Sequence, residues 1–476
     1  MALTDRPEAA CPVAATEPAS FRDPGNQVFY ADGQVLRGLR GQAVRDWEAL
    51  VASEFFHRLV GEGALCATEP AGEAYDGFEL TLRHERVPFL SYPYEWTFSM
   101  LRDAALLHLD VVAAAVAEGL ITKDGSAYNV QWRGARPVFI DIGSFERLRE
   151  GEAWAGYRQF CQTMLYPLLL TAHLGVDFQP LLRAQIDGIE PGQMRRLFGG
   201  TKRWKAGVFK HVHLHDAMAT RLAGTSSQQI QQELRAAGYS SDLVLATVRA
   251  VRKLVHRLQW RPPDTHWQSY RQTCSYSESD RQAKLAFVEA ALAAAGQQDL
   301  VLDLGANDGA FSRLAAGYAR HVVAVESDHA VVDELYQRLR QEGDGPGQRI
   351  QPVVMDLANP SPGSGWCSRE RAAFLDRVSA DTVLALALVH HLAIGRNVPL
   401  PQVCDLLAGL GRRLVVEFVD PADPMAARLL ANKPAGMFGD YRREVFEQLL
   451  AQRFTVLRQQ ALPSGTRTLY LVAAGG

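Results

Sequence analysis

The sequence predicts an α/β protein of two domains, with an open and mainly parallel sheet in the C-terminal domain. Three observations support this fold class. Residues 300–312 (LVLDLGANDGAFS) read as a buried strand, a glycine-containing turn and the start of a helix. Four more short apolar runs follow at the spacing of strands that alternate with helices. Before them, residues 261–264 (RPPD) interrupt the helical periodicity and mark a linker to an N-terminal α+β domain.

The domain boundaries follow from composition and length. Residues 1–25 are rich in Ala, Pro and Thr, and we expect them to form a flexible arm. Residues 26–260 are expected to form the α+β domain and residues 264–476 the α/β domain. Two domains suit a chain of 476 residues, because a domain usually takes roughly 100–200 residues.

Composition excludes several classes of partner. Fifty basic and fifty-three acidic side chains leave a formal charge of −3, so no overall charge draws the chain to nucleic acid or to an anionic membrane. The six cysteines form no CxxC pair, and no run of about 18 apolar residues is present. We therefore expect a cytoplasmic protein with reduced thiols, without a membrane or nucleic-acid partner. The oligomeric state is not predicted.

The N-terminal domain is expected to begin with strands, a helix and further strands, and to continue with helices. The expected elements are strands in 27–39 around a turn at 31–33, a helix at 43–62, strands at 78–83 and 87–91, helices in 95–119, a hairpin turning at 133–135, and helices from 151 to 258.

In the C-terminal domain, the turn after the first strand has the character of a ligand cradle. The strand carries Asp303, and Gly305, Asn307 and Gly309 follow it. Glycine permits strained dihedral angles and a close approach of a ligand to the backbone. The free N–H groups of the next helix favour an anionic group. An ordinary loop between a strand and a helix is the alternative.

Polar residues follow the next three strands as well. The strand at 321–326 ends in Glu326, whose carboxylate can accept both hydrogen bonds of a ribose diol. The strand at 350–355 is followed by Asp356 and Leu357, which can hold an adenine amino group and ring. The strand at 381–388 is followed by His390 and His391. Because parallel strands present their carboxyl ends at one edge, these residues should line one crevice.

This order of motifs resembles the class I S-adenosylmethionine-dependent methyltransferases over about residues 264–476. The turn reads D-x-G-x-N-x-G and lacks the second glycine of the dinucleotide pattern G-x-G-x-x-G. A fifth strand at 414–419 and two strands at 454–461 and 466–473, around the turn at 463–465, match the antiparallel hairpin that closes the sheet of that family. The resemblance implies a Rossmann-like methyltransferase sheet with S-adenosylmethionine as cofactor. The implied cofactor-binding residues are Asp303, Gly305, Asn307, Gly309, Glu326, Asp356 and Leu357.

Three residues are candidates for catalysis. His390 and His391 stand where the methyl group would be presented, and an imidazole titrating near neutrality can act as a base. Glu417 is a polar residue in the otherwise apolar fifth strand. The alternative is that these side chains are packed and only shape the pocket. No metal ligand is assigned, and no Asn/Asp-Pro-Pro-Tyr/Phe tetrad follows the fourth strand.

A second set of polar residues lies in the N-terminal domain. Asp124 and Asn129 are five positions apart, and Asp141 begins the sequence Asp-Ile-Gly. This spacing resembles the catalytic loop and the metal-binding motif of the protein-kinase-like fold, whose carboxylates and amide hold a metal-bound triphosphate. The glycine-rich loop and the strand lysine of that fold are missing, with Arg37 or Arg40 near the lysine position. We therefore expect a catalytically silent kinase-like domain; alternatively, the three side chains only cap turns.

Two further patterns of this domain have competing interpretations. Residues 195–210 hold a basic cluster with Trp204 and Phe209, which reads as a solvated face or as a phosphate-binding patch. His211, His213 and His215 alternate and would share one face of a strand. Three imidazoles can bind zinc, but only Asp216 is near to complete a site, so a packed or surface histidine row is the interpretation.

The acceptor is expected between the domains, above the end of the fourth strand. Three segments are expected to enclose it: an insert at 359–378, a loop at 393–399 and an aromatic lead-in at 267–276. The insert offers Trp366, Arg369, Glu370 and Arg371 for contact with a substrate.

Together with HERVPFLSYPYEW and VVEFVDPADP, these motifs resemble a bacterial two-part methyltransferase-like group labelled as nodulation-associated. The resemblance implies a methyltransferase for a small-molecule, glycan or peptide acceptor in bacterial secondary metabolism or modification, with the N-terminal domain recruiting or orienting the acceptor. The alternatives are an ATP-dependent phosphotransferase with an accessory S-adenosylmethionine-binding domain, and a catalytically silent sensor of S-adenosylmethionine.

Overall fold

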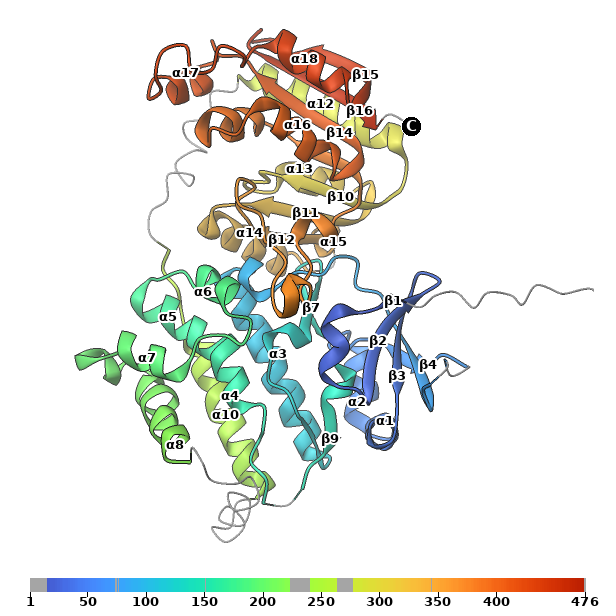
Figure 1. Cartoon of the computed structure of the whole chain (residues 1–476), viewed down its shortest axis with the longest axis vertical. Coiled ribbons are helices and arrows are strands. Elements are labelled where there is room, and N and C mark those ends of the chain that lie inside the picture. The colour runs from blue at the N-terminus through green and yellow to red at the C-terminus, as the bar shows by residue number, and fades with distance from the viewer. Residues whose placement is uncertain are drawn as a thin grey trace, which may run out of the picture.

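The computed structural model describes residues 15–72, 75, 77–149, 151–222, 240–262, 277–343 and 345–474. Figure 1 shows the N-terminal domain, coloured blue to yellow-green, below a C-terminal sheet domain coloured yellow to red. None of the helices within these ranges combines the length and the apolar character that crossing a bilayer requires.

The C-terminal sheet confirms the predicted α/β class. Its seven strands run in the order β12-β11-β10-β13-β14-β16-β15, all parallel from β12 to β14, with β16 antiparallel to both of its neighbours. The strands are β10 (Gln298–Leu304), β11 (Ala319–Glu326), β12 (Ile350–Val354), β13 (Ala380–Ala385), β14 (Gly411–Val419), β15 (Phe454–Ala461) and β16 (Arg467–Ala474). The predicted closing hairpin is present. β13 ends three residues before its predicted end, so residues 386–388 belong to the loop at the crevice.

Helices cover both faces of this sheet, which is why its strands read as continuous apolar runs. Successive residues point to opposite faces: Val301 belongs to one core and Leu302 to the other. The covering elements are α12 (Glu278–Ala295), α13 (Ala310–Ala315), α14 (His329–Gln341), α15 (Phe374–Arg377), η10 (His391–Gly395), α16 (Leu400–Ala408), α17 (Pro424–Leu430) and α18 (Arg443–Ala451).

The N-terminal domain begins with a five-stranded antiparallel sheet in the order β1-β2-β3-β5-β4. The elements are β1 (Ala15–Thr16), η1 (Pro18–Arg22), β2 (Asn26–Ala31), β3 (Gln34–Leu39), α1 (Gln42–Val51), α2 (Glu54–Gly61), β4 (Thr68–Pro70) and β5 (Leu80–His84). The predicted helix at 43–62 is therefore two helices, broken at Ala52 and Ser53. No strand forms at 87–91, and β4 was missed because it is short and half-exposed.

The predicted flexible arm needs a correction at its end. Residues 1–14 lie outside the described residues. Ala15 and Thr16, however, pair with β2, and Glu17 accepts a hydrogen bond from the Tyr30 hydroxyl at 2.6 Å. Backbone pairing and this side-chain contact fix the stretch, so the residues from Ala15 onward belong to the folded domain and not to a flexible arm.

The rest of the N-terminal domain is built on the buried helix α3 (Phe98–Ala117). Two short strand pairs follow, and the predicted turn at 133–135 joins the second pair. These strands are β6 (Leu120–Thr122) with β9 (Phe145–Arg147), and β7 (Val130–Arg133) with β8 (Arg136–Phe139). The helices are α4 (Tyr157–Phe160), η5 (Cys161–Leu165), α5 (Tyr166–Leu174), α6 (Gln179–Ala184), α7 (Pro191–Leu197), η6 (Gly200–Trp204), η7 (Phe209–Leu214), α8 (His215–Leu222) and α10 (Ser241–Arg257).

A buried polar interface joins the two domains. Residues 89–99, which connect the N-terminal sheet to α3, pack on the β12 edge and on the insert. Gln351 of β12 donates from Nε2 to Ser91 Oγ at 2.9 Å. The guanidinium of Arg377 in α15 pairs with the carboxylate of Glu95, and both side chains are buried. The C-terminal sheet is thus held against the segment that connects the two parts of the N-terminal domain (Figure 1).

Candidate functional site

The strand ends of the C-terminal sheet surround a cavity of about 740 Å³. The lining includes six of the seven predicted cofactor residues, namely Asp303, Gly305, Asn307, Glu326, Asp356 and Leu357, and also His391. Gly309, the seventh, is the residue before α13 at the end of the same turn. The crevice predicted from the sequence is therefore present where the parallel strands end.

The turn after β10 takes left-handed backbone conformations at Gly305 (φ +73°), Asn307 (φ +47°) and Gly309 (φ +79°). The two glycines serve different purposes. A Cβ on Gly305 would have only Leu388 nearby, at 3.7 Å, so the backbone there remains open toward the cavity. A Cβ on Gly309 would stand 2.6 Å from the Leu335 side chain, so this glycine permits the turn to pack on α14.

Asp303 closes the inner end of the cavity. Its side chain is almost fully buried and accepts a hydrogen bond from Ser312 Oγ at 2.6 Å. Burial raises the pKa of this carboxyl to about 6, and the Ser312 hydrogen bond and the Lys284 charge act against that rise. The group is thus an acceptor at neutral pH, close to a cation.

Glu326 is held by backbone N–H groups at the end of β11. Its Oε1 accepts from Ser327 N at 2.6 Å and from Asp328 N at 3.1 Å, and its Oε2 accepts from Asn307 N at 3.3 Å. These bonds orient the carboxylate at the cavity wall. A carboxylate in this position can accept the two hydroxyl hydrogens of a ribose.

Asp356 already has a cationic partner. The carboxylate lies against the guanidinium of Arg396, which also lines the cavity, and accepts from Ala358 N at 2.9 Å. Arg396 directly follows η10, which contains the first three residues of the loop predicted at 393–399, and its side chain reaches the crevice. Leu357 beside Asp356 supplies an apolar wall.

The two candidate histidines differ in their access to the cavity. His391 begins η10 and lines the cavity, whereas His390 is fully buried and is not part of the lining. Neither ring nitrogen of His390 has a hydrogen-bond partner among the described residues, and its ring centroid lies 4.1 Å from that of His391. Burial lowers the pKa of His391 to about 4 and that of His390 well below its ordinary value. Both imidazoles are therefore neutral near pH 7.

Glu417 lies in the middle of a buried ion network behind the cavity. Its carboxylate is fully buried, 2.7 Å from Lys284 Nζ and 3.3 Å from Arg467. Arg467 also pairs with Asp423 at 2.7 Å. Glu417 does not line the cavity, but Lys284 does. Any influence of Glu417 on a ligand therefore passes through Lys284, and its role as a base stays a prediction.

The sequence analysis missed Lys284 and Arg281 of α12, and Phe311 of α13, as wall residues. The signal for Lys284 was available. It occupies the buried face of α12 together with Phe287, Val288 and Ala291, and a lysine on an apolar helix face is rare unless it is paired. Lys284 Nζ also lies 5.2 Å from the Phe311 ring centroid.

The insert at 359–378 does not enclose the crevice. Glu370 is paired with Arg22 of the N-terminal domain at 2.8 Å, and the guanidinium of Arg371 lies 4.3 Å from the Tyr128 ring centroid. None of the insert's four proposed contact residues lines the cavity. Two of its charged side chains find partners on the other domain instead, and contact of the insert with an acceptor stays a prediction. The lead-in at 267–276 lies outside the described residues.

In the N-terminal domain, the three candidate polar residues come together around β7 and β8. Asp141 is 3.1 Å from the guanidinium of Arg37, which also donates to Asn26 Oδ1 at 2.6 Å. Burial, and then the charge of Asp141, raise the pKa of Asp124. The Asn129 side-chain nitrogen is buried and has no hydrogen-bond partner among the described residues. Arg37 thus lies beside the carboxylate of Asp141, the residue that begins the Asp-Ile-Gly sequence.

The histidine row is packed, but not on a strand. Its residues lie in η7 and at the start of α8, and each ring is hydrogen-bonded to a different partner. His211 is bonded to the Tyr157 hydroxyl at 2.5 Å, His213 to Phe198 O at 3.1 Å and His215 to the Tyr166 hydroxyl at 2.9 Å. Within the described ranges, no three histidine, cysteine or carboxylate side chains are grouped to hold a metal ion.

The strand order, with one antiparallel strand inserted before the last, and the crevice at the strand ends define the class of the C-terminal domain. This domain has the fold of the class I S-adenosylmethionine-dependent methyltransferases. Nodulation protein NoeA of Rhizobium meliloti (strain 1021) is 32% identical to the chain over 473 residues, which cover 97% of this chain and 97% of that protein. The chain therefore belongs to the NoeA family. No protein-family model matches it.

Solved methyltransferases are similar to part of the chain. The N-methyltransferase NodS of Bradyrhizobium japonicum WM9 shares 12% identity and covers 42% of this chain and 99% of its own, with a TM-score of 0.31. Magnesium protoporphyrin IX methyltransferase (ChlM) of Synechocystis PCC 6803, with bound S-adenosylhomocysteine, shares 16% identity and covers 44% and 94%, with a TM-score of 0.32. TM-scores this low do not support an argument. The fold of the C-terminal domain is therefore assigned from its strand order and not from these two structures.

Proposed function

We propose that the protein transfers a methyl group from S-adenosylmethionine to an acceptor bound at the crevice of the C-terminal domain. The observation that carries this proposal is the cavity in which side chains from four strand ends meet. Asp303, Glu326 and Asp356 supply acceptors for the polar groups of the cofactor, and Leu357 supplies an apolar side for its adenine ring. When bound, the cofactor supplies a methyl group on a cationic sulfur, and the chain's own residues orient the acceptor for in-line attack.

Calorimetric titration of the full chain with S-adenosylmethionine and S-adenosylhomocysteine tests the proposal. Glu326→Ala removes the acceptor of the diol hydrogen bonds and should weaken binding by about 1–3 kcal/mol, the range for a charged hydrogen bond left unmade. Glu334→Ala, on the exposed side of α14 and outside the cavity lining, is the control and should bind like the parent chain. A folded parent chain without affinity for either compound would overturn the proposal.

The proposed acceptor is a small molecule, a glycan or a peptide, and the N-terminal domain recruits or orients it. The buried interface supports this role, because it keeps the N-terminal domain in a fixed position next to the methyltransferase domain. The NoeA relative, which matches both domains, is named as a nodulation protein, and this supports a bacterial modification pathway. We propose a cytoplasmic location, where the cofactor is available.

Methyl-labelled S-adenosylmethionine tests the acceptor assignment. Extracts of producing cells should yield a labelled product with the parent chain and none with Glu326→Ala. If the cofactor binds but no fraction of the extract becomes labelled, the results favour a catalytically silent sensor of S-adenosylmethionine over a methyltransferase.

For the N-terminal domain we propose a kinase-like module that does not transfer phosphate. The order of elements supports the fold: three sheet strands, the α1–α2 pair in place of the single expected helix, two more sheet strands, the long α3, the Asp124 loop, the β7–β8 hairpin and Asp141. The Arg37–Asp141 ion pair supports the absence of phosphotransfer, because it occupies a carboxylate that would otherwise bind the metal ion. ATP-dependent phosphotransfer is the alternative. Calorimetry with Mg-ATP together with an assay of ATP turnover separates the two, and we expect no turnover.

A further inference from the structure

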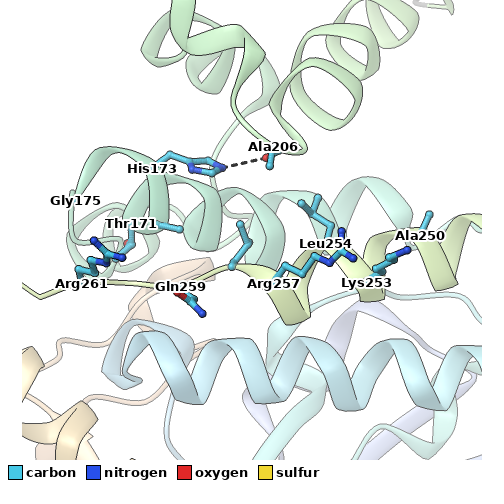
Figure 2. Close-up of a pocket in the computed structure, with 12 residues that line it drawn as sticks. Thr171, His173, Gly175, Ala206, Ala250, Lys253, Leu254, Arg257, Gln259 and Arg261 are labelled. Atoms are coloured by element: carbon cyan, nitrogen blue, oxygen red, sulfur yellow. Dashed lines mark hydrogen bonds between the residues drawn. The ribbon is translucent and has the colours of Figure 1, made fainter.

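A second large cavity lies in the N-terminal domain, away from the strand ends of the C-terminal sheet. It has a volume of about 590 Å³ and lies between α5, the turn at Ala206 and the end of α10 (Figure 2). Volumes of this order are typical of small-molecule sites.

All the charged side chains that line this cavity are cationic. Lys253 and Arg257 lie one turn apart on α10, and Arg261 follows the helix end (Figure 2). No acidic residue lines the cavity, and none of these three side chains forms an ion pair among the described residues. The neighbouring Arg252, by contrast, is paired with Asp110. In a chain with a formal charge of −3, three cations around one hollow are a local concentration of positive charge.

The walls of the cavity are held by packing and hydrogen bonding. His173 of α5 donates from Nε2 to Ala206 O at 3.0 Å, which ties the turn to α5 (Figure 2). On the other side the turn is pressed on α10, since a Cβ on Gly207 would meet the Leu254 side chain at 2.3 Å. Leu254 and Ala206 give the hollow an apolar wall beside its cations.

The basic cluster of residues 195–210 adjoins this cavity. Lys205 directly precedes Ala206, and the exposed Trp204 ring stacks on Phe209 with a centroid distance of 5.1 Å. The cluster is exposed, as its interpretation as a solvated face predicts. It adds positive charge to the rim of the hollow.

We infer that this cavity binds a small ligand that carries two or more phosphate groups. Residues four apart on a helix present their side chains about 5–6 Å from each other, so Lys253 and Arg257 can hold neighbouring phosphates. The Arg257 guanidinium can bind one phosphate through two N–H groups, and the Lys253 ammonium acts as a compact point charge. The apolar wall at Leu254 takes the uncharged part of the ligand. The site is independent of methyl transfer in the C-terminal domain.

Helix-end electrostatics is the competing explanation, because cations in the last turn of a helix stabilise its dipole. Under that explanation, the cations raise the melting temperature and bind nothing specific. The two explanations differ in what a diphosphate does to the full chain.

Calorimetric titration of the full chain with inorganic pyrophosphate, at physiological ionic strength, tests the inference, with inorganic phosphate as the weaker probe. Pyrophosphate should bind more tightly than phosphate, and both Lys253→Gln and Arg257→Gln should weaken it at least about tenfold. Arg249→Gln, one turn earlier on α10 and outside the lining, is the matched control and should keep the affinity of the parent chain. Melting curves confirm that each variant is folded.

Two results would overturn the inference. One is a folded parent chain that does not bind pyrophosphate. The other is equal affinity in the parent chain and in both lining variants, with lower melting temperatures in the variants alone, which would leave the cations a helix-end role. If pyrophosphate binds, titration with a nucleoside diphosphate and with a sugar diphosphate identifies which uncharged group the apolar wall accepts, as the one that binds more tightly.

Discussion

The crevice of the C-terminal domain and the polar cluster around Asp141 in the N-terminal domain both contain carboxylates that follow strands, but the two sets differ in what lies next to them. In the C-terminal crevice, Asp303 and Glu326 lie beside a cavity of about 740 Å³. In the N-terminal domain, Asp141 is instead paired with the guanidinium of Arg37 at 3.1 Å. The carboxylates of the crevice thus border space that a ligand can fill, whereas Asp141 contacts the protein's own arginine.

The space next to one glycine of each site differs in the same way. A Cβ on Gly305 would point into open space near the cavity, whereas a Cβ on Gly143 would collide with the Asn26 side chain at 1.7 Å and with the Arg37 guanidinium at 2.4 Å. In the crevice the glycine leaves room for a ligand. In the N-terminal domain the glycine leaves room for the protein's own arginine.

The largest effect that we expect is acid destabilisation of both domains. Burial lowers the pKa values of seven described histidines, namely His84, His108, His211, His215, His321, His390 and His391. Each takes up a proton near pH 6.5 when unfolded but only at a lower pH when folded. The unfolded state therefore binds more protons in this window, and stability falls as the pH drops from about 6.5 toward about 4. The maximal slope is about 1.4 kcal/mol per pH unit for each histidine.

Urea unfolding at several pH values between about 7 and about 5 measures this effect. His321→Gln should flatten the dependence by up to one histidine's share, since burial lowers its pKa to about 4. The raised pKa of Asp303 has the opposite effect on stability below about pH 6, and it offsets part of the loss caused by the histidines. A free energy of unfolding that is constant over this range would contradict the burial of these rings.

Next in size is the cost of breaking the ion network behind the crevice. Arg467→Ala leaves Glu417 and Asp423 without their shared cation, and both carboxylates are buried. Removing one partner of a buried ion pair costs about 3–5 kcal/mol, so the urea midpoint should fall strongly. Arg83→Ala, in an exposed pair with Glu69, is the control and should cost about 1 kcal/mol or less. Equal effects of the two substitutions would mean that the network is hydrated and not buried.

A smaller but functional contrast separates the three catalytic candidates. If the acceptor needs a base, His391→Ala should lower turnover by roughly 10²–10⁴-fold and leave cofactor affinity nearly intact. His391 is the candidate that lines the cavity, so His390→Ala should act mainly on stability, and Glu417→Gln should act through the position of Lys284. Unchanged turnover in all three variants would show that these residues are structural.

The sequence was sufficient for what local patterns determine. Apolar runs and glycines predicted all seven strands of the C-terminal sheet and the turn with Asp303 and Asn307, because the strand period and positive φ are local constraints. The apolar helix face around Lys284 indicated that this lysine is paired, but its partner Glu417 was not predictable, since it is 133 positions away. The same holds for the insert, where Arg22 and Glu370 are 348 positions apart. Long-range charge pairing decided where these segments lie, and periodicity contains no information about it.

The smallest effect concerns the silent site and tests the contrast directly. Asp141→Asn removes one charge from the Arg37 pair, but the Asp141 side chain is 25% exposed and Arg37 keeps its hydrogen bonds to Asn26 and His84. The substitution should therefore cost about 1 kcal/mol or less in unfolding free energy. ATP turnover should be absent in the parent chain and in the variant alike. Turnover in the parent chain that disappears in Asp141→Ala would mean that Arg37 leaves Asp141 when Mg-ATP binds. The N-terminal site would then resemble the crevice, with carboxylates that a ligand can reach.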